Sequence, residues 1–398
     1  MYILYNPQGN TEGHSQQYAT NIVNGLINAG FNVEMVTSQD FDPSGVNNSS
    51  RFKVRHTEIA DTRSVTKNDS GFIGRLAYGT LILKNNFKSF RALIKSIKEN
   101  EFLHLSIIGG DTLSNLMFLF FSFRLDKSKC SITIHNADYD LELYRHDFAR
   151  YVFKLVSKLL LKSLVRGRLV VFTHGEIMSK VLAEQLGCSN ERIDFYRVPA
   201  ARSKSSFIVK KPVNNPVRLL FLGVIRYDKG LDILCSCLSE IKSTTQFELI
   251  IAGSPIQVGK TYVYSLIEQF NLADRTRLEL RYLSDSEVED FIIEADITVL
   301  PYRKTFIAKS VVMSDTARLG TPAIATIGSQ NGFDVNEFDV GWPFISENHH
   351  DLVRIIKLAI DEVLEGNSNF GFSSYIEEHL PSSVGAKIKS VMENSSAK

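Results

Sequence analysis

The chain has 398 residues, enough for about two domains, and its 44% hydrophobic and 22% charged residues are ordinary for a soluble globular protein. Its four cysteines have no paired spacing and no neighbouring histidines, which excludes a disulfide framework and a zinc site and favours a reducing compartment. The net charge of +1 conceals a basic half, residues 1–215 with a balance of +9, and an acidic half, residues 216–398 with a balance of −8, which indicates two domains with different partners.

The N-terminal half alternates predicted strands with predicted helices. The apolar run Tyr2–Tyr5 and the alternating run Phe31–Thr37 are typical of strands, and apolar residues at helical spacing lie between them, from about Tyr18 to a C-cap at Gly30. Further apolar runs are Leu103–Ile108, Ser131–His135 and Leu169–Phe172. Strands separated by helices form βαβ units, so we expect a parallel sheet.

Two segments of this basic half combine basic and apolar faces at helical spacing. The first has one continuous basic face made of Lys84, Lys88, Arg91, Lys95 and Lys98. Its apolar stripe is made of Phe87, Phe90, Ile94 and Ile97. The second runs from Arg150 to Arg166 with a basic residue at every fourth position. Such helices suit an anionic membrane surface, whereas two ordinary surface helices with apolar stripes facing the core are the alternative.

The polar segment Lys210–Pro216, with two prolines, is predicted to be a linker. The strand–helix alternation restarts directly after it, in the runs VRLLFLG, FELIIAG, LELRYL, DITVLP and PAIAT. We therefore expect an α/β protein with two Rossmann-like doubly wound domains, at residues 1–212 and 213–374. A helical segment, residues 375–398, is expected to pack back toward the first domain.

The sequence FLGVIRYDKG forms the first candidate binding site. Its strand ends at Gly223, which permits close approach of a ligand to the backbone, and Arg226 and Lys229 place two cations in the turn that follows. For this motif alone, a solvated turn with two surface cations is the simpler alternative.

The sequence KSVVMSDTARLGTPAIA forms the second candidate site. Ser310 is placed to cap a short helix that ends at Gly320, and the free N–H groups and dipole of such a helix form an anion site. Asp315, one turn into the helix, can accept hydrogen bonds from a ribose diol. An ordinary capped helix with a surface aspartate is the alternative.

The order of these motifs resembles the donor domain of the retaining GT-B glycosyltransferases of family 4, the glycosyl transferases group 1. The resemblance includes FELIIAG and YLSDSEVEDFIIEADITVLPYR, which lie between the two sites. The N-terminal half is similar more weakly, through EGHSQQYATNIVNGLINAGFNVEMVT, ITIHN and VVFTHGEIMSKVL. The resemblance implies two Rossmann-like domains facing a cleft that binds a nucleotide-sugar donor.

On the donor side, the resemblance implies a diphosphate site. Arg226 and Lys229 would hold the diphosphate and stabilise the negative charge that develops as the nucleoside diphosphate leaves. Gly223 and the backbone N–H groups of Ser310 and Val311 would complete this site.

The remaining parts of the substrates are assigned by the same resemblance. Asp315 would bind the ribose, and the backbone near Leu283 would meet the base. His135 would lie near the reacting carbon of the sugar, although a packed or capping histidine is the alternative. Gly9 and Gly13 belong to the glycine-rich loop on the acceptor side.

The implied activity is transfer of a sugar to a saccharide or lipid-linked saccharide, as in bacterial surface polysaccharide or glycolipid assembly. The family retains the anomeric configuration and uses no metal. We therefore expect a retaining, hexosyltransferase-like enzyme with a UDP- or GDP-linked sugar as co-substrate, no cofactor and no nucleic-acid partner.

The sequence departs from the family pattern at Ile307. Many members have two glutamates separated by seven residues; Asp315 aligns with the second, and Ile307 replaces the first with a side chain that cannot bond a sugar hydroxyl. A non-catalytic GT-B-like accessory subunit is therefore the alternative function. A sugar-nucleotide epimerase is a third, but its acid and base residues have no candidates here.

The location of the protein is predicted from what the sequence does not contain. The first residues lack a basic region followed by a long apolar run, so we expect no secretory signal. No stretch reaches the ~18 apolar residues of a spanning helix, and the most apolar segment, Leu113–Phe123, is predicted to be a buried helix. We expect a cytoplasmic protein that is peripheral on the cytoplasmic membrane face.

Overall fold

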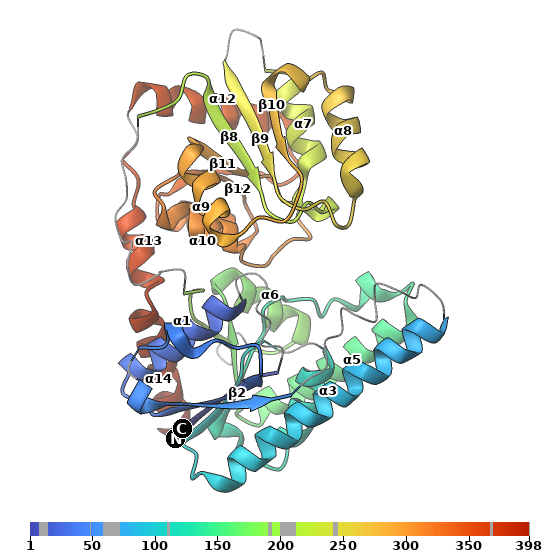
Figure 1. The fold of residues 1–398 in the computed structure, drawn as a ribbon, viewed down its shortest axis with the longest axis vertical. Helices are drawn as coiled ribbons and strands as arrows, with labels where there is room; N and C mark the ends of the chain where they lie inside the picture. Colours follow the sequence, from blue (N-terminus) through green and yellow to red (C-terminus); the bar gives the residue numbers. More distant parts are fainter. Residues whose placement is uncertain are drawn as a thin grey trace. The chain divides into compact units, whose positions relative to one another are not determined.

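The computed structural model describes residues 1–7, 15–47, 49–58, 72–109, 112–189, 193–199, 212–241, 246–366 and 369–397. The chain divides into two compact units. Unit 1 comprises Met1–Pro199 and Pro381–Lys398, and unit 2 comprises Ala200–Leu380. Each unit is an α/β domain built on one sheet (Figure 1). Unit 1 therefore ends before the expected boundary at residue 212, and only the last helix of the chain returns to it.

Seven parallel strands form the sheet of unit 1, in the order β3-β2-β1-β4-β5-β6-β7. Their bounds are β1 (Tyr2–Asn6), β2 (Val33–Ser38), β3 (Phe52–Thr57), β4 (His104–Ile107), β5 (Cys130–Thr133), β6 (Val170–Thr173) and β7 (Ile193–Phe195). The inner strands are buried along their whole length, which is why they read as continuous apolar runs in the sequence.

Helices cover both faces of this sheet. Alternate residues of β1 divide between two cores: Ile3 and Tyr5 belong to one, and Tyr2 and Leu4 to the other. The first core lies under α3 (Phe72–Glu99), α4 (Thr112–Ser122), α5 (Phe148–Arg166) and α6 (Glu176–Leu186). The second lies under α1 (Ser15–Asn28) and α14 (Pro381–Ala397).

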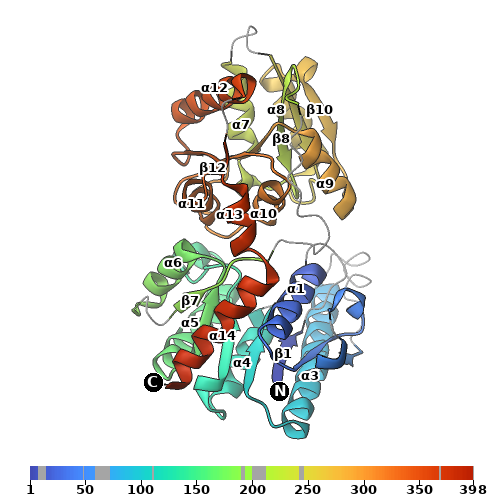
Figure 2. The same ribbon diagram turned by 90° about the vertical axis from the view of Figure 1, so that its left-hand side faces the viewer.

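Helices α1 and α14 cross at two glycines, and both views show them side by side (Figure 2). A methyl group on Gly25 would come 2.3 Å from the carbonyl oxygen of Pro381, and one on Gly385 would come 1.9 Å from that of Gly25. The two backbones therefore meet without any intervening side chain. Lys389 Nζ adds a hydrogen bond of 3.2 Å to the carbonyl oxygen of Ala29.

Six parallel strands form the sheet of unit 2, in the order β10-β9-β8-β11-β12-β13. They are β8 (Val217–Leu222), β9 (Phe247–Ala252), β10 (Thr276–Glu279), β11 (Ile297–Leu300), β12 (Ala323–Thr326) and β13 (Gly341–Phe344). Its helices are α7 (Leu231–Ser239), α8 (Gly259–Gln269), α9 (Asp285–Glu294), α10 (Val311–Arg318), α11 (Gln330–Glu337), α12 (His349–Glu365) and α13 (Phe372–Glu378). Strands β9 and β10 are added on one side of β8, and β11 to β13 on the other, so the strand order reverses between β8 and β11. This is a doubly wound Rossmann-like sheet, and ligands bind such sheets beyond the carboxyl ends of the two strands at the reversal.

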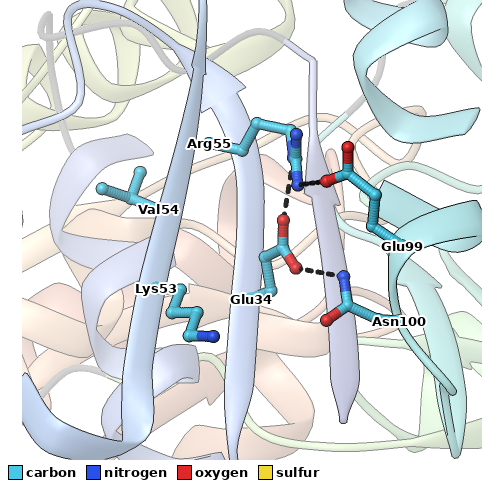
Figure 3. Close-up of a pocket in the computed structure, with 6 residues that line it drawn as sticks. All are labelled: Glu34, Lys53, Val54, Arg55, Glu99 and Asn100. Atoms are coloured by element: carbon cyan, nitrogen blue, oxygen red, sulfur yellow. Dashed lines mark hydrogen bonds and ion pairs between the residues drawn. The ribbon is translucent and has the colours of Figure 1, made fainter. Parts of the chain in front are cut away.

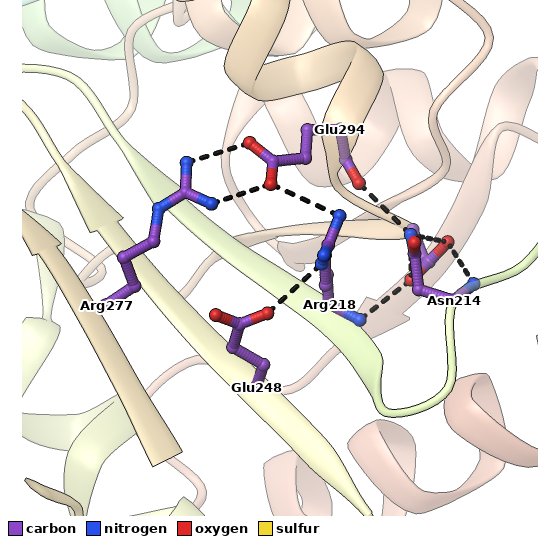
Figure 4. Close-up of polar contacts among 6 residues, drawn as sticks. Asn214, Arg218, Glu248, Arg277 and Glu294 are labelled. Atoms are coloured by element: carbon purple, nitrogen blue, oxygen red, sulfur yellow. Dashed lines mark hydrogen bonds and ion pairs between the residues drawn. The ribbon is translucent and has the colours of Figure 1, made fainter. Parts of the chain in front are cut away.

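The amino ends of the unit 2 strands are closed by a polar network (Figure 4). Asp296 is buried and accepts hydrogen bonds from the backbone N–H groups of Asn214 (3.2 Å) and Arg218 (2.7 Å). Glu294 forms ion pairs with Arg218 (3.2 Å) and Arg277 (2.6 Å). Because these groups satisfy one another, this edge of the sheet is structural, which leaves the opposite edge for binding.

Candidate functional site

The loops that follow β8 and β11 meet at the point where the strand order of unit 2 reverses. Lys229, from the first loop, has its Nζ 5.2 Å from the centre of the Tyr302 ring in the second. Gly223 ends β8 with a φ of 107°, and a methyl group there would come 3.3 Å from Lys229 Nζ and 3.4 Å from Val312 Cγ2. Lys229, Gly223 and the first turn of α10 are therefore neighbours at the ligand-binding edge of the sheet.

Lys229 is a largely buried cation. Only 8% of the residue is exposed, and no described residue forms an ion pair or a hydrogen bond with its Nζ. A buried charge is costly unless it is paired, so this ammonium, which has no partner among the described residues, is a candidate contact for an anion.

Arg226, in contrast, has a partner in the same turn. Its Nε and Nη2 donate to the two carboxylate oxygens of Asp228, at 3.0 and 2.8 Å, and its guanidinium lies 5.8 Å from the centre of the Phe306 ring. Both members of the pair are about one third exposed. A phosphate that binds Arg226 through Nε and Nη2 would have to displace Asp228, whereas the Nη1 side of the guanidinium is not used by this ion pair.

At the N-terminus of α10, one of the two backbone N–H groups expected to bind a phosphate is already hydrogen-bonded. Ser310 is at the N-cap position, as expected, but its side chain makes no capping hydrogen bond. Its N–H donates to Asn331 Oδ1 at 2.8 Å, and its hydroxyl lies 3.2 Å from that of Tyr302. The N–H of Val311 has no acceptor among the residues that the structure describes. The amide of Val311, rather than that of Ser310, is thus available to an anion.

The other donor-side candidates lie on the same unit. Asp315 is 9% exposed, and its Oδ1 lies 3.6 Å from Nη2 of Arg318, which also donates to Glu289 at 2.8 Å. Leu283 is buried between β10 and α9. Ile307, half-buried, accepts a hydrogen bond at its carbonyl oxygen from the N–H of Gln330.

In unit 1, His135 belongs to an aromatic cluster at the carboxyl ends of its strands. His135 Nδ1 lies 2.8 Å from His174 Nε2, so the two rings share one proton between these nitrogens. Tyr18 contacts both rings at centroid distances of 5.3 and 5.5 Å, and its hydroxyl lies 2.6 Å from that of Tyr196. His135 is exposed and His174 is buried. Gly9 and Gly13, expected in the loop before α1, lie outside the described residues.

The outer faces of α3, α4 and α5 carry basic and large apolar side chains together. On α3, the expected basic face is exposed: Lys84, Lys88, Arg91, Lys95 and Lys98. The apolar stripe was only partly predicted, because Phe90 and Ile97 pack on the core of unit 1 while Phe87, 52% exposed, faces outward. Further exposed apolar side chains on these helices are Leu83, Phe120, Phe148, Val152, Phe153 and Leu159. None of the described helices is long and apolar enough to span a membrane.

A polar pocket of about 620 Å³ lies at the amino ends of β2 and β3, where no ligand site is expected (Figure 3). Arg55 donates to Glu34 at 2.8 Å and to Glu99 at 2.6 Å, and Asn100 donates to the second oxygen of Glu34 at 2.7 Å. These side chains use one another as partners, which indicates a structural network.

Several residues of the candidate sites were not singled out from the sequence. Asp228 accepts from Arg226, and Asn331 accepts the N–H of Ser310. The positions of these residues in the sequence indicate neither contact. Gly253 could have been found from the sequence, because it follows the apolar run FELIIA as Gly223 follows VRLLFL. Its φ is 133°, and a methyl group there would come 2.0 Å from the carbonyl oxygen of Gly223. Two adjacent strands therefore end in glycines that let their backbones touch.

Comparisons with known proteins agree with this architecture. Residues 203–371 match the model of the family described as glycosyl transferases group 1. No curated protein sequence matches the chain. The sucrose-phosphate synthase of Thermosynechococcus elongatus is similar in structure with a TM-score of 0.70 at 14% identity, over 100% of this chain and 99% of that one. WaaG, a glycosyltransferase involved in lipopolysaccharide biosynthesis, gives 0.61 at 12% identity, over 98% and 99%. HepE of Anabaena, solved with UDP and glucose, gives 0.58 at 14% identity, over 100% and 98%.

Proposed function

We propose that the protein transfers a sugar from a nucleoside-diphosphate sugar to a saccharide or lipid-linked saccharide. The match of residues 203–371 to the glycosyl transferases group 1 model and the GT-B fold support this proposal. Donor binding is assigned to unit 2. HepE, of the same fold, has been solved with UDP-glucose, which makes a UDP-linked sugar the first donor to test, with a GDP-linked sugar as the second.

Lys229 is the observation that carries this proposal. This ammonium group is largely buried and unpaired among the described residues. It lies near Gly223, at the end of β8, and near the first turn of α10, a placement that suits the doubly charged diphosphate of such a donor. As the glycosidic bond to the leaving diphosphate breaks, negative charge grows on the diphosphate, and a fixed cation in a water-poor site stabilises that charge more than it stabilises the substrate.

Arg226 and Val311 complete the leaving-group site. Arg226 exchanges Asp228 for a phosphate oxygen when the donor binds, and the N–H of Val311 donates to a second oxygen at the positive end of α10. Three cationic or N–H contacts of this kind neutralise the diphosphate without a metal ion.

Asp315 is assigned to the ribose, the backbone at Leu283 to the base, and His135 to the region of the reacting sugar carbon. Asp315 lies on α10 one turn after Val311, and its Oδ1 is 3.6 Å from Nη2 of Arg318. Retention of the anomeric configuration follows from the family 4 type to which we assign the protein.

The acceptor side is assigned to unit 1 at an anionic membrane surface, on its cytoplasmic face. The exposed basic face of α3 supports this, because its five cations lie beside the exposed side chains of Leu83 and Phe87. Helix α5 has five basic residues from Arg150 to Arg166 and no acidic residue of its own, and of these Lys154 is paired with Asp138 at 2.7 Å. A lipid-linked acceptor, as in surface polysaccharide or glycolipid assembly, would be presented at such a surface.

A non-catalytic accessory subunit is the second candidate, and Ile307 favours it. This residue offers a sugar hydroxyl no polar side chain where many relatives have a carboxylate. Slow hydrolysis of UDP-glucose or another nucleotide sugar by the purified chain, with release of the nucleoside diphosphate, would rule this candidate out.

The test of the proposed function is calorimetric titration with UDP and with GDP, each with and without EDTA. We expect binding that EDTA leaves unchanged. Lys229→Met should abolish it or weaken it by about 30- to 1000-fold, the equivalent of the 2–4 kcal/mol that a charged contact of this kind supplies. Lys357→Met, which removes an exposed lysine from α12 of the same unit, is the matched control. Binding that requires a metal, or that survives Lys229→Met unchanged, would contradict the proposal.

A further inference from the structure

A second buried lysine lies directly before the helix that we assign to the diphosphate. The side chain of Lys309, two residues before Val311, is 1% exposed, and so is that of Asp334 on α11. Lys309 Nζ donates to the carboxylate of Asp334 and to the hydroxyl of Tyr375 on α13, the latter at 2.7 Å. Burial disfavours the charge, yet Asp334 and Tyr375 together hold the pKa of Lys309 above its usual value. Lys309 is therefore charged, and it links the segment before α10 to α11 and α13.

The backbone around Lys309 is held as firmly as its side chain. Gln330 donates its N–H to the carbonyl oxygen of Ile307 at 3.2 Å, and Asn331 donates to that of Ala308 at 3.3 Å. Asn331 also accepts the N–H of Ser310. Residues 307–310 are thus fixed on the first turn of α11, and they set the direction in which α10 begins.

Tyr375 brings α13 into the same arrangement. Its hydroxyl accepts from Lys309 and donates to Ser314 Oγ of α10 at 3.2 Å, while its ring stacks on His379 with centroids 3.8 Å apart. A single phenolic oxygen therefore bonds both the residue before α10 and a residue inside it. Helix α13 is also the last helix of unit 2 before the chain passes to unit 1 at Pro381.

We propose that Asp334 and Tyr375 are positioning residues of the donor site, which act through Lys309 on the N-terminus of α10 and make α13 part of the diphosphate-binding machinery. The inference rests on the proposed function, since it takes the N–H of Val311 as a phosphate ligand. The orientation of this N–H then depends on the hydrogen bond that Lys309 donates to Tyr375, 66 residues further along the chain.

Tyr375→Phe tests the inference most directly. It removes the hydroxyl but keeps the ring that stacks on His379 and contacts Phe338. UDP titrated into the folded variant should bind about 2- to 10-fold more weakly, the range expected for one hydrogen bond. A merely structural tyrosine would lower the unfolding temperature and leave the Kd for UDP unchanged. Ser374→Ala, at an exposed position of α13, and Tyr2→Phe, at a buried tyrosine of unit 1, are the controls.

A second variant keeps the inference testable if Tyr375→Phe is poorly folded. Lys309→Met combined with Asp334→Leu replaces the buried ion pair with apolar side chains of similar size, a change that proteins often tolerate without loss of stability. This double variant should fold and bind UDP more weakly than wild type, by at least the factor seen for Tyr375→Phe. Wild-type affinity in both variants would overturn the inference and leave the proposed function standing. Wild type that binds neither UDP nor GDP would overturn both.

Discussion

Arg226 donates to both carboxylate oxygens of Asp228, two residues further along the same turn, whereas Lys229, the next residue, has no anionic partner among the described residues. The two cations of this motif therefore differ in whether an internal carboxylate is bound to them. Lys229 has no carboxylate to displace, whereas the Nε and Nη2 side of Arg226 is occupied by an internal carboxylate.

The exchange at Arg226 predicts that Asp228 opposes donor binding. Asp228→Asn removes the charge that competes with the phosphate, so UDP should bind more tightly, by about 2- to 5-fold for a partly exposed pair worth less than 1 kcal/mol. Calorimetry at low salt is the measurement. Asp290→Asn, an exposed position on α9, makes the same change in net charge and is the control. Weaker binding by Asp228→Asn would mean that Asp228 orients Arg226 instead of competing for it.

The assignment of Asp315 to the ribose predicts that Asp315→Asn no longer discriminates UDP from its deoxyribose analogues. Removing a charge-assisted hydrogen bond should weaken UDP binding by about 10- to 100-fold. Wild type should prefer UDP to 2′-deoxy-UDP and to the 3′-deoxy analogue, and the variant should bind all three with similar affinity. If Asp315→Asn keeps the wild-type preference, another group binds the ribose.

The basic face of α3 predicts salt-dependent binding to lipid. Co-sedimentation with liposomes should rise with the content of anionic lipid and fall with salt. Replacing Lys84, Lys88, Arg91 and Lys95 by glutamine should weaken binding by about 1 kcal/mol for each lost charge. The matched control replaces four exposed basic residues of unit 2 by glutamine: Lys260, Lys304, Arg354 and Lys357. Equal losses in the two variants would point to net charge alone, and no sedimentation of wild type at low salt would favour a soluble acceptor.

His104 predicts acid sensitivity of unit 1. Burial lowers its pKa to about 3, and its Nε2 lies 2.9 Å from Ser131 Oγ, so the folded protein holds it neutral. In the unfolded chain it binds a proton below pH 6.5. The stabilising effect of the neutral ring is therefore complete above pH 6.5 and is lost, at about 1.4 kcal/mol per pH unit, as the pH falls toward 3. Urea unfolding at pH 7 and pH 5 should show a smaller decrease for His104→Gln than for wild type. An equal decrease in both proteins would assign the acid sensitivity to other groups.

The fold could be predicted from the sequence because strands and helix ends are indicated by residues that are close together in the chain. Runs such as VRLLFLG and DITVLP are largely apolar because both faces of a central parallel strand are covered. The start of α10 was also predictable, because Ser310 is an N-cap residue and Gly320 follows the last turn.

Contacts between distant residues could not be predicted in this way. The N–H of Ser310 is taken by Asn331, 21 residues away, and nothing in the spacing of the two residues indicates it. The stripe on α3 was wrong in part for a related reason. Helical periodicity shows that Phe87 and Phe90 lie near each other, but which of them faces the sheet depends on how the helix packs.

The crossing of α1 and α14 also has a consequence for how the protein is made. Lys389 and Ala29, which bond there, are separated by 360 residues. A ribosome has therefore to synthesise α14 before this helix can pack on α1 at Gly25, and until then the part of the first sheet that α14 covers is exposed. The N-terminal domain, although synthesised first, is finished last, and premature termination within α14 would release a chain with an intact unit 2 and an uncovered apolar surface on unit 1.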